Sequence, residues 1–186
     1  GLNRSMDVET AQVVAKFREM ESSNIDAIVA PGVDEEAVDI LRKTRRRMVL
    51  YSVPELEPLP ATSMNIKQVP GGLLYQQANI TPIDRTSWKV ATKNSPTPEQ
   101  LNGMEEAWLL MRHIRSNTIL VWDEANGVTL GIGSGQVSRV GSARIALEQA
   151  GEHAKGAMLA SDSFFPFQDT VELAAQYGIA AIVQQG

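Results

Sequence analysis

At 186 residues, with 43% hydrophobic and 21% charged side chains, the chain has the composition of a globular protein that buries a core. Its net charge of −5 argues against a nucleic-acid-binding protein, which needs a positive face, and we expect no nucleic-acid partner. The absence of cysteine excludes disulfides, thiolate catalysis and cysteine-ligated zinc. No apolar run approaches the roughly 20 residues that span a bilayer, so we expect no membrane partner and a cytoplasmic location.

The first part of the chain is predicted to alternate helices and strands. Asp7 can cap a helix over residues 8–23. The apolar run 25–30 predicts a buried strand, Asp34 starts a second helix, and residues 48–53 form a second strand. This succession is typical of a parallel crossover unit. The basic run at the end of the second helix is interpreted as a solvent-exposed helix C-terminus, where positive charges complement the helix dipole.

The middle of the chain is predicted to connect two subdomains. Three prolines mark an irregular stretch, and Gly71-Gly72 lies inside an expected extended segment, 67–76. We place residues 1–88 in a first lobe with its connecting segment and residues 89–186 in a second lobe. The sequence Thr97-Pro98-Glu99-Gln100 predicts a helix start with a capping box.

The second lobe is predicted to mix hairpin strands with helices. Asn126-Gly127 is a hairpin-type turn between its first two strands. The expected strands are 118–122, 128–132, 157–161 and 179–183, and the expected helices after the capping box are 139–150 and 169–177. The fold class is therefore α/β, with two three-layer lobes.

A glycine-rich turn, Gly131-x-Gly133-x-Gly135, leads into a helix that opens with Arg139. The spacing departs from the dinucleotide fingerprint, and the turn lacks the lysine of a P-loop. A cation at the positive end of a helix is unfavourable. The position therefore favours an arginine that offers its planar fork to a bound carboxylate, phosphate or carboxamide.

A second segment, Phe164-Phe165-Pro166-Phe167, lies between Asp162 and Asp169. Core packing explains one or two of the rings, but the flanking acids make a wholly apolar role less fitting. Together with the glycine-rich turn, the segment predicts a site for an anionic small molecule that carries a ring. The two histidines in the sequence, His113 and His153, read as surface residues.

Several stretches in order along the chain resemble the transformylase domain of the bifunctional AICAR transformylase/IMP cyclohydrolase family. The matching stretches are residues 26–37, 71–74, 90–93, 116–117, 131–139 and 161–169. The resemblance implies cytidine-deaminase-like α/β lobes with three layers and a mixed sheet. It also implies the reaction, in which a formyl group passes from 10-formyltetrahydrofolate to the 5-amino group of AICAR during purine (IMP) biosynthesis.

The resemblance also implies site residues. The positions that match AICAR contacts in the family are Asp26, Asn117, Arg139 and Phe164, the folate-side positions are Val140 and Asp169, and those near a monovalent-cation site, commonly potassium, are Ser116, Thr118 and Asp162. The co-substrates implied are AICAR and 10-formyltetrahydrofolate, and the family forms homodimers.

The departures from the family are equally informative. No residue of this chain matches the family's catalytic Lys-His pair, which lies upstream of Gly1, and the cyclohydrolase domain is absent. We therefore expect a portion of an AICAR transformylase, inactive alone, with the missing N-terminal portion as a further partner. The alternative is a noncatalytic stand-alone relative that binds nucleotide or folate or serves a structural role.

Overall fold

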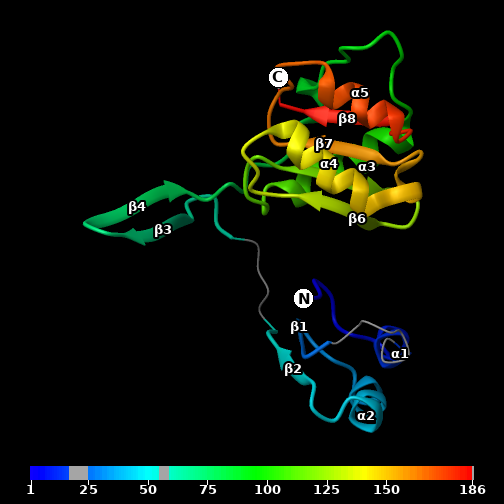
Figure 1. The fold of residues 1–186 in the computed structure, drawn as a ribbon. Coiled ribbons are helices and arrows are strands. Elements are labelled where there is room, and N and C mark those ends of the chain that lie inside the picture. The colour runs from blue at the N-terminus through cyan, green and yellow to red at the C-terminus, as the bar shows by residue number, and fades with distance from the viewer. Residues whose placement is uncertain (17–24, 55–58, 186) are drawn as a thin grey trace. The chain divides into compact units, whose positions relative to one another are not determined.

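The computed structural model describes residues 1–16, 25–54 and 59–185. Its contacts divide the chain into two compact units, Gly1–Ala78 and Asn79–Gly186. Figure 1 shows the course of the chain. Each unit is described by itself below.

The first unit contains the expected crossover. β1 (Ala27–Ala30) and β2 (Val49–Ser52) pair in parallel, and α2 (Glu35–Thr44) connects them. Asp34 occupies the N-cap position of α2, as predicted. α1 (Val8–Lys16) confirms the first part of the helix expected over 8–23, and residues 17–23 of that expectation lie outside the described residues.

The core of the first unit lies between its helices and one face of the β1–β2 pair. α1 packs against α2. The buried side chains of this core are Met6, Ala11, Val14, Ile28, Ala30, Ala37 and Leu41. Alternation along β1 buries Ile28 and Ala30 and leaves Val29 exposed. The small parallel pair therefore keeps its other face uncovered among the described residues.

The segment expected to be extended over 67–76 is instead a hairpin. β3 (Met64–Val69) and β4 (Gly72–Gln77) pair antiparallel, and the chain reverses between them. Pro70 lacks the amide hydrogen that would continue a ladder, and Gly71 has a φ of 85°, a left-handed conformation that glycine adopts readily. These two residues explain why one expected strand becomes two.

The second unit is built on a mixed four-stranded sheet in the order β6-β5-β7-β8. Its strands are β5 (Ile119–Asp123), β6 (Val128–Gly133), β7 (Met158–Ser161) and β8 (Ala181–Gln184). β5 is antiparallel to both β6 and β7, and β7 is parallel to β8. The turn at Asn126-Gly127 joins β5 to β6 as predicted.

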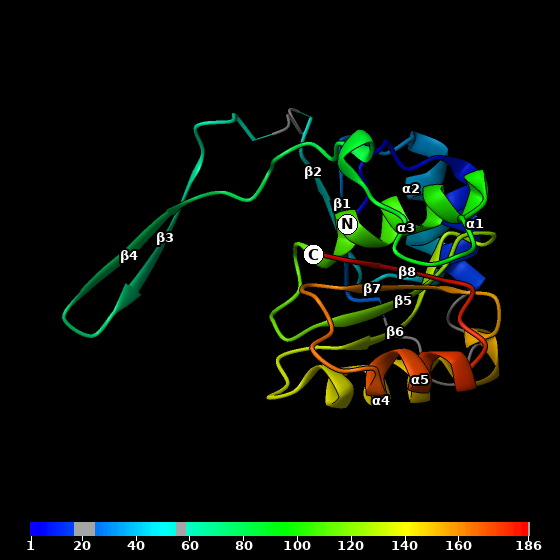
Figure 2. The ribbon, with the colours of Figure 1, turned by 90° about the horizontal axis from the view of Figure 1, so that it is seen from above.

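Helices cover both faces of this sheet, which gives the three layers expected for the second lobe. α3 (Pro98–Met111) lies on one face, and α4 (Arg139–Ala150) and α5 (Asp169–Gln176) lie on the other (Figure 2). Alternate residues of β5 serve the two cores: Leu120 and Trp122 face α3, whereas Ile119 and Val121 face α4. The α/β class is thus confirmed, and the likeness to cytidine deaminases stays a prediction.

Local signals account for the ends of these helices. Thr97 Oγ1 accepts a hydrogen bond from the Gln100 amide, and the Gln100 side chain accepts one from the Thr97 amide, so the predicted capping box is present. α4 ends at Gly151, with a φ of 54°. Two short 3₁₀ turns complete the unit, η2 (Arg85–Ser87) and η3 (Gly151–Ala154).

Residues 79–88, which the sequence analysis assigns to the first lobe, fold with the second unit. Arg85 forms an ion pair with Glu105 and donates a hydrogen bond to Asn102, both on α3. Trp88 packs against the core beneath α3. The assignment of residues 1–88 and 89–186 to two lobes of the family stays a prediction.

Candidate functional site

The topology of the second unit brings most of the predicted site residues to one end of its sheet. Because β5 is antiparallel to its neighbours, its first residue, Ile119, pairs with Gly133 at the end of β6 and with Ser161 at the end of β7. The residues just before β5 therefore meet those that follow β6 and β7. These are segments 116–118, 134–139 and 162–164, which are distant in sequence.

Asn117 is held in place on both its side chain and its main chain. Its Nδ2 donates a 2.8 Å hydrogen bond to the Gln136 carbonyl. Its carbonyl oxygen accepts from Ser142 Oγ at 2.8 Å and from the Gln136 amide at 3.4 Å. The Ser116–Asn117 peptide is cis. The side chain of Asn117 is thus oriented, and its Oδ1 atom can accept a hydrogen bond from a ligand.

The Arg115 carbonyl ties the same two loops together. It accepts hydrogen bonds from the hydroxyl of Thr118, from Ser134 Oγ at 3.1 Å and from the Gly135 amide at 2.8 Å. Gly135 has a φ of 67°, which permits the sharp turn after β6. The glycine-rich turn is therefore fixed to the segment that carries Asn117.

Arg139 is the first residue of α4 and faces Asp162. Its Nε lies 3.9 Å from Asp162 Oδ1, and the two side chains are 23% and 17% exposed. That separation is an ion pair but exceeds hydrogen-bonding distance. Both atoms are buried and have no hydrogen-bond partner among the described residues. A buried polar atom without a partner is costly, and in functional sites a ligand commonly supplies the partner.

Two of the glycines in the turn motif serve packing and not ligand approach. A Cβ placed on Gly133 would lie 1.9 Å from the Ser142 carbonyl oxygen, and one on Gly131 would lie 2.0 Å from that of Ala146. α4 thus packs directly on the backbone of β6. The glycines fix the depth of α4 and, through it, the position of Arg139.

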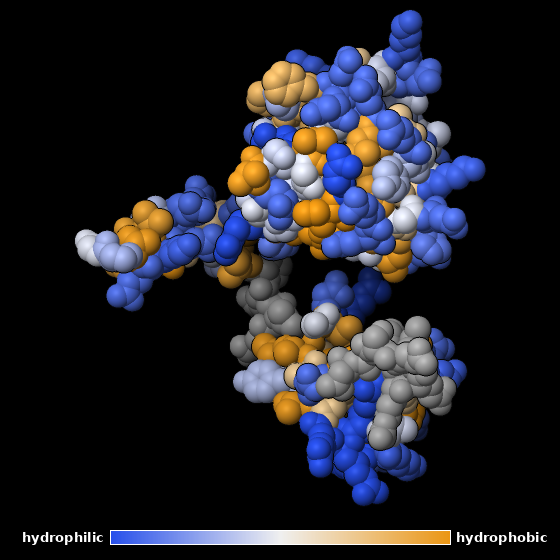
Figure 3. All heavy atoms as spheres, in the orientation of Figure 1, coloured by the Kyte–Doolittle hydropathy of each residue, from blue (hydrophilic) through white to orange (hydrophobic). Residues whose placement is uncertain are grey.

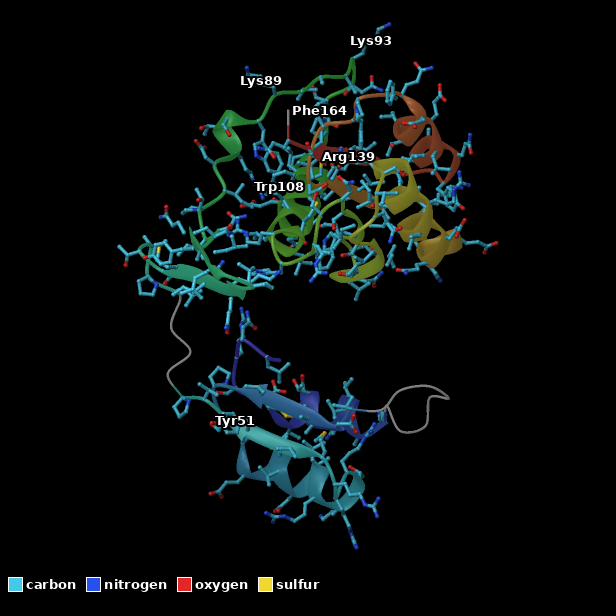
Figure 4. The ribbon with its side chains drawn as sticks, turned by 60° about the vertical axis from the view of Figure 1, so that its left-hand side comes forward. Tyr51, Lys89, Lys93, Trp108, Arg139 and Phe164 are labelled. Carbon is cyan, nitrogen blue, oxygen red and sulfur yellow. The ribbon has the colours of Figure 1, made fainter. Side chains whose placement is uncertain are left out.

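The aromatic segment divides as expected between packing and exposure. Phe165 packs against the core under α4 and α5. Phe164 and Phe167 are 55% and 73% exposed. Figure 4 marks Phe164 and Arg139 in the second unit. An exposed ring close to the end of β7 offers a stacking surface beside the Arg139–Asp162 pair.

The two predicted folate-side residues lie on the helices that flank this end of the sheet. Val140 is partly buried on the first turn of α4. Asp169 is exposed at the start of α5, where its Oδ1 accepts a hydrogen bond from the Thr170 amide. Among the described residues, neither side chain forms a hydrogen bond or ion pair with Arg139 or Asn117. Asp26, the remaining predicted contact, is an exposed residue of the first unit, next to β1.

Three oxygen-bearing residues predicted near a cation also gather here. Thr118 is fully buried, and its carbonyl oxygen accepts from the Asp162 amide at 3.3 Å. Asp162 Oδ1 has no hydrogen-bond partner in the described part of the chain, and Ser116 is exposed beside Thr118. Oxygen donors suit a hard cation such as potassium, so the residues fit the implied ion chemically. No group of three His, Cys, Asp or Glu side chains suited to a metal occurs within the described ranges.

Sequence reasoning missed Gln136, Ser134 and Ser142, the residues that hold Asn117 and the turn in place. Gln136 acts through its backbone carbonyl, for which no residue type is required. Serines within a helix and a turn have many uses, so their pattern carries no signal.

In the described residues, no helix is both long and apolar enough to cross a bilayer.

Comparison with known proteins identifies the family. A family model described as the AICARFT/IMPCHase bienzyme matches residues 1–149. The whole chain aligns with proteins called "Bifunctional purine biosynthesis protein PurH" from Cyanothece sp., Prochlorococcus marinus and Nostoc sp., at 46%, 45% and 44% identity. The chain spans 34% of the length of each of these relatives. The chain belongs to the AICARFT/IMPCHase bienzyme family.

Proposed function

We propose that this chain is a portion of an AICAR transformylase in purine biosynthesis and that its second unit holds AICAR. The observation that carries the proposal is the Arg139–Asp162 pair, whose buried Nε and Oδ1 atoms lack hydrogen-bond partners beside the fixed Asn117. In the complete enzyme, the formyl group would pass from 10-formyltetrahydrofolate to the amine of AICAR. Identity above 40% over the whole chain to bifunctional enzymes does not favour the noncatalytic alternative.

The chemistry of AICAR complements the groups at this end of the sheet. The nucleotide carries a phosphate, ribose hydroxyls, a carboxamide and an aromatic imidazole. Arg139 supplies N–H donors for an oxygen of the ligand, and Asn117 Oδ1 supplies an acceptor for an N–H or O–H of the ligand. The exposed Phe164 ring offers a face for stacking. Asp26, in the first unit, is proposed as a further contact.

The groups that flank AICAR are assigned by the same proposal. Val140 and Asp169 would face 10-formyltetrahydrofolate, and Ser116, Thr118 and Asp162 would hold potassium. A bound potassium ion would supply fixed positive charge near the nucleotide. This chain's contribution is then to bind and orient the two substrates, which converts the transfer into an effectively unimolecular reaction.

The proposal extends to the organisation of the full protein. Residues 1–88 would belong to the first transformylase lobe with its connecting segment, and residues 89–186 to the second, cytidine-deaminase-like lobe. The full protein would be a cytoplasmic homodimer, and the remaining part of the polypeptide would supply the catalytic groups.

Calorimetric titration of the chain with AICAR tests this proposal. We expect saturable binding that Arg139→Ala weakens by at least tenfold, since a lost charge-assisted hydrogen bond corresponds to about 1.5–3 kcal/mol. The matched control is Arg144→Ala, which removes an exposed arginine from the same helix and should leave the affinity unchanged. Absence of heat at millimolar AICAR, or an equal loss in both variants, would refute the proposal. A folate analogue added to the AICAR complex then tests the second substrate.

A further inference from the structure

We infer that Ser142 is a positioning residue that fixes the main chain of Asn117 relative to Arg139. The inference rests on the proposed function, because it concerns the same AICAR site. Ser142 lies on α4 three residues after Arg139 and is itself fully buried. Its side chain reaches from α4 to the segment before β5. It therefore connects the helix that carries the arginine to the loop that carries the asparagine.

The hydrogen bonds of Ser142 define this connection. Its Oγ donates at 2.8 Å to the carbonyl of Asn117 and lies 3.3 Å from the carbonyl of Ser138, the N-cap residue of α4. The other donor to the Asn117 carbonyl is the Gln136 amide, at the longer distance of 3.4 Å. The Ser142 hydroxyl is thus the shorter of the two contacts that hold this peptide unit.

The backbone of Ser142 is fixed as firmly as its hydroxyl. The Ser142 carbonyl lies where a Cβ on Gly133 would be, only 1.9 Å away, so α4 and β6 are in direct backbone contact at this residue. The helix cannot shift toward the strand without a collision. The hydroxyl consequently holds Asn117 at a set distance from a rigid anchor, and Arg139 projects from the same anchor one turn earlier.

Because Ser142 is buried, water cannot readily replace its hydroxyl as the donor to the Asn117 carbonyl. A buried carbonyl that loses its donor is left partly unpaired, and its peptide unit moves to find another. Displacement of the Asn117 peptide also moves the Nδ2–Gln136 hydrogen bond and hence the direction of Oδ1. A misplacement of about 1 Å in a positioning group can cost about 100-fold in the rate of the reaction.

The test combines calorimetry with nuclear magnetic resonance on three forms of the full chain. Ser142→Ala removes the hydroxyl alone. Ala146→Gly is the control, because it weakens the same helix at a buried position away from Asn117. We expect Ser142→Ala to raise the Kd for AICAR on the order of tenfold. We expect it also to shift the Asn117 side-chain amide resonances, whereas Ala146→Gly should lower the melting temperature without either effect.

The outcomes distinguish a failure of the proposed function from a failure of the role assigned to Ser142. If the wild-type chain does not bind AICAR, the proposed function fails, and the Asn117 amide resonances still test the role of Ser142. If wild type binds and Ser142→Ala binds equally, with unchanged Asn117 resonances, the inference is wrong. Should Ser142→Ala fail to fold, Ser142→Cys keeps the shape of the side chain, with a slightly larger atom and only a weak donor, and is expected to show the same two changes.

Discussion

Arg139 and Asp162 are partly buried charges that stabilise each other without a hydrogen bond. Sequence reasoning identified the arginine from a mismatch, a cation at the positive end of a helix. The structure supplies the compensation, a carboxylate at the end of β7. The sequence alone could not pair Asp162 with Arg139, because the pairing depends on the order of the strands. The same limit applies to Asn117 and its partners in the turn after β6.

A double-mutant cycle at Arg139 and Asp162 measures the coupling of the two charges. We expect Arg139→Ala and Asp162→Asn to couple by about 0.5–1 kcal/mol in the free energy of unfolding, since the pair is close but partly solvated. Urea unfolding of the four forms gives this value. The same unfolding curves show directly whether Arg139→Ala is folded, which makes the binding test interpretable. A coupling of zero would mean that the two side chains do not interact in solution.

Glycines at the two ends of β6 differ in how much space they leave for an added side chain. Gly133 contacts α4 through its backbone, whereas Gly127 in the β5–β6 turn has a φ of 63° and open space around its Cα. We expect Gly127→Ala to cost about 1–2 kcal/mol from the left-handed conformation alone. Gly133→Ala should cost more than twice as much, because α4 must move away from the strand. Chemical unfolding compares them, and equal losses would contradict direct packing of α4 on β6.

Two turn carboxylates are expected to make the stability of the second unit depend on pH. Hydrogen bonds from the Thr86 side chain and amide lower the pKa of Asp84, and hydrogen bonding from the Asn126 side chain is the main cause of the lowered pKa of Asp123. A carboxylate whose pKa is lower in the folded state stabilises the fold at pH values above its pKa in the unfolded chain, about 4. This stability is lost as the pH falls through the pKa of the folded state.

Thermal melts between pH 7 and pH 2.5 test this dependence. We expect the melting temperature of the chain to fall below about pH 4. The Asp123→Asn variant removes one of the titrating groups and should show a shallower fall. An identical pH profile for variant and wild type would show that Asp123 does not contribute through its ionisation.

Elements with strong local signals were predictable from sequence. The capping box at Thr97, the turn at Asn126-Gly127 and the glycine at the end of α4 act within a few residues, so their structure follows from their own chemistry. The β3–β4 hairpin was missed because the expected segment ran through Pro70-Gly71, a turn signal that the interpretation as one extended segment overlooked. That residues 79–88 pack with the second unit could not be read from the sequence, because the contacts of Arg85 and Trp88 with α3 are tertiary.

At the scale of the whole molecule, the hairpin presents an apolar face that the chain leaves exposed. Opposite residues of an antiparallel pair share a face, which places Met64, Ile66, Leu73 and Tyr75 together. The last three are 63%, 66% and 67% exposed, and Figure 3 shows hydrophobic residues at the surface of the hairpin. A two-stranded hairpin alone is marginally stable in water. This face fits the proposed homodimer.

Sedimentation of the chain over a range of concentrations tests for self-association. We expect a reversible dimer that the variant Ile66→Lys weakens by placing a charge on the apolar face. Lys67→Ala is the control, since Lys67 lies on the opposite face of the same strand. A monomer at the highest concentration, or an equal effect of the two variants, would remove the hairpin from the proposed dimer.

The place where AICAR binds is central to the proposed function of the chain. Backbone amide resonances of the full chain, recorded by nuclear magnetic resonance during titration with AICAR, locate the nucleotide directly. We expect shifts concentrated in residues 116–118, 134–140 and 162–164, and their loss in Arg139→Ala. Saturable shifts confined to other parts of the chain, or no shifts at millimolar AICAR, would contradict the proposed function.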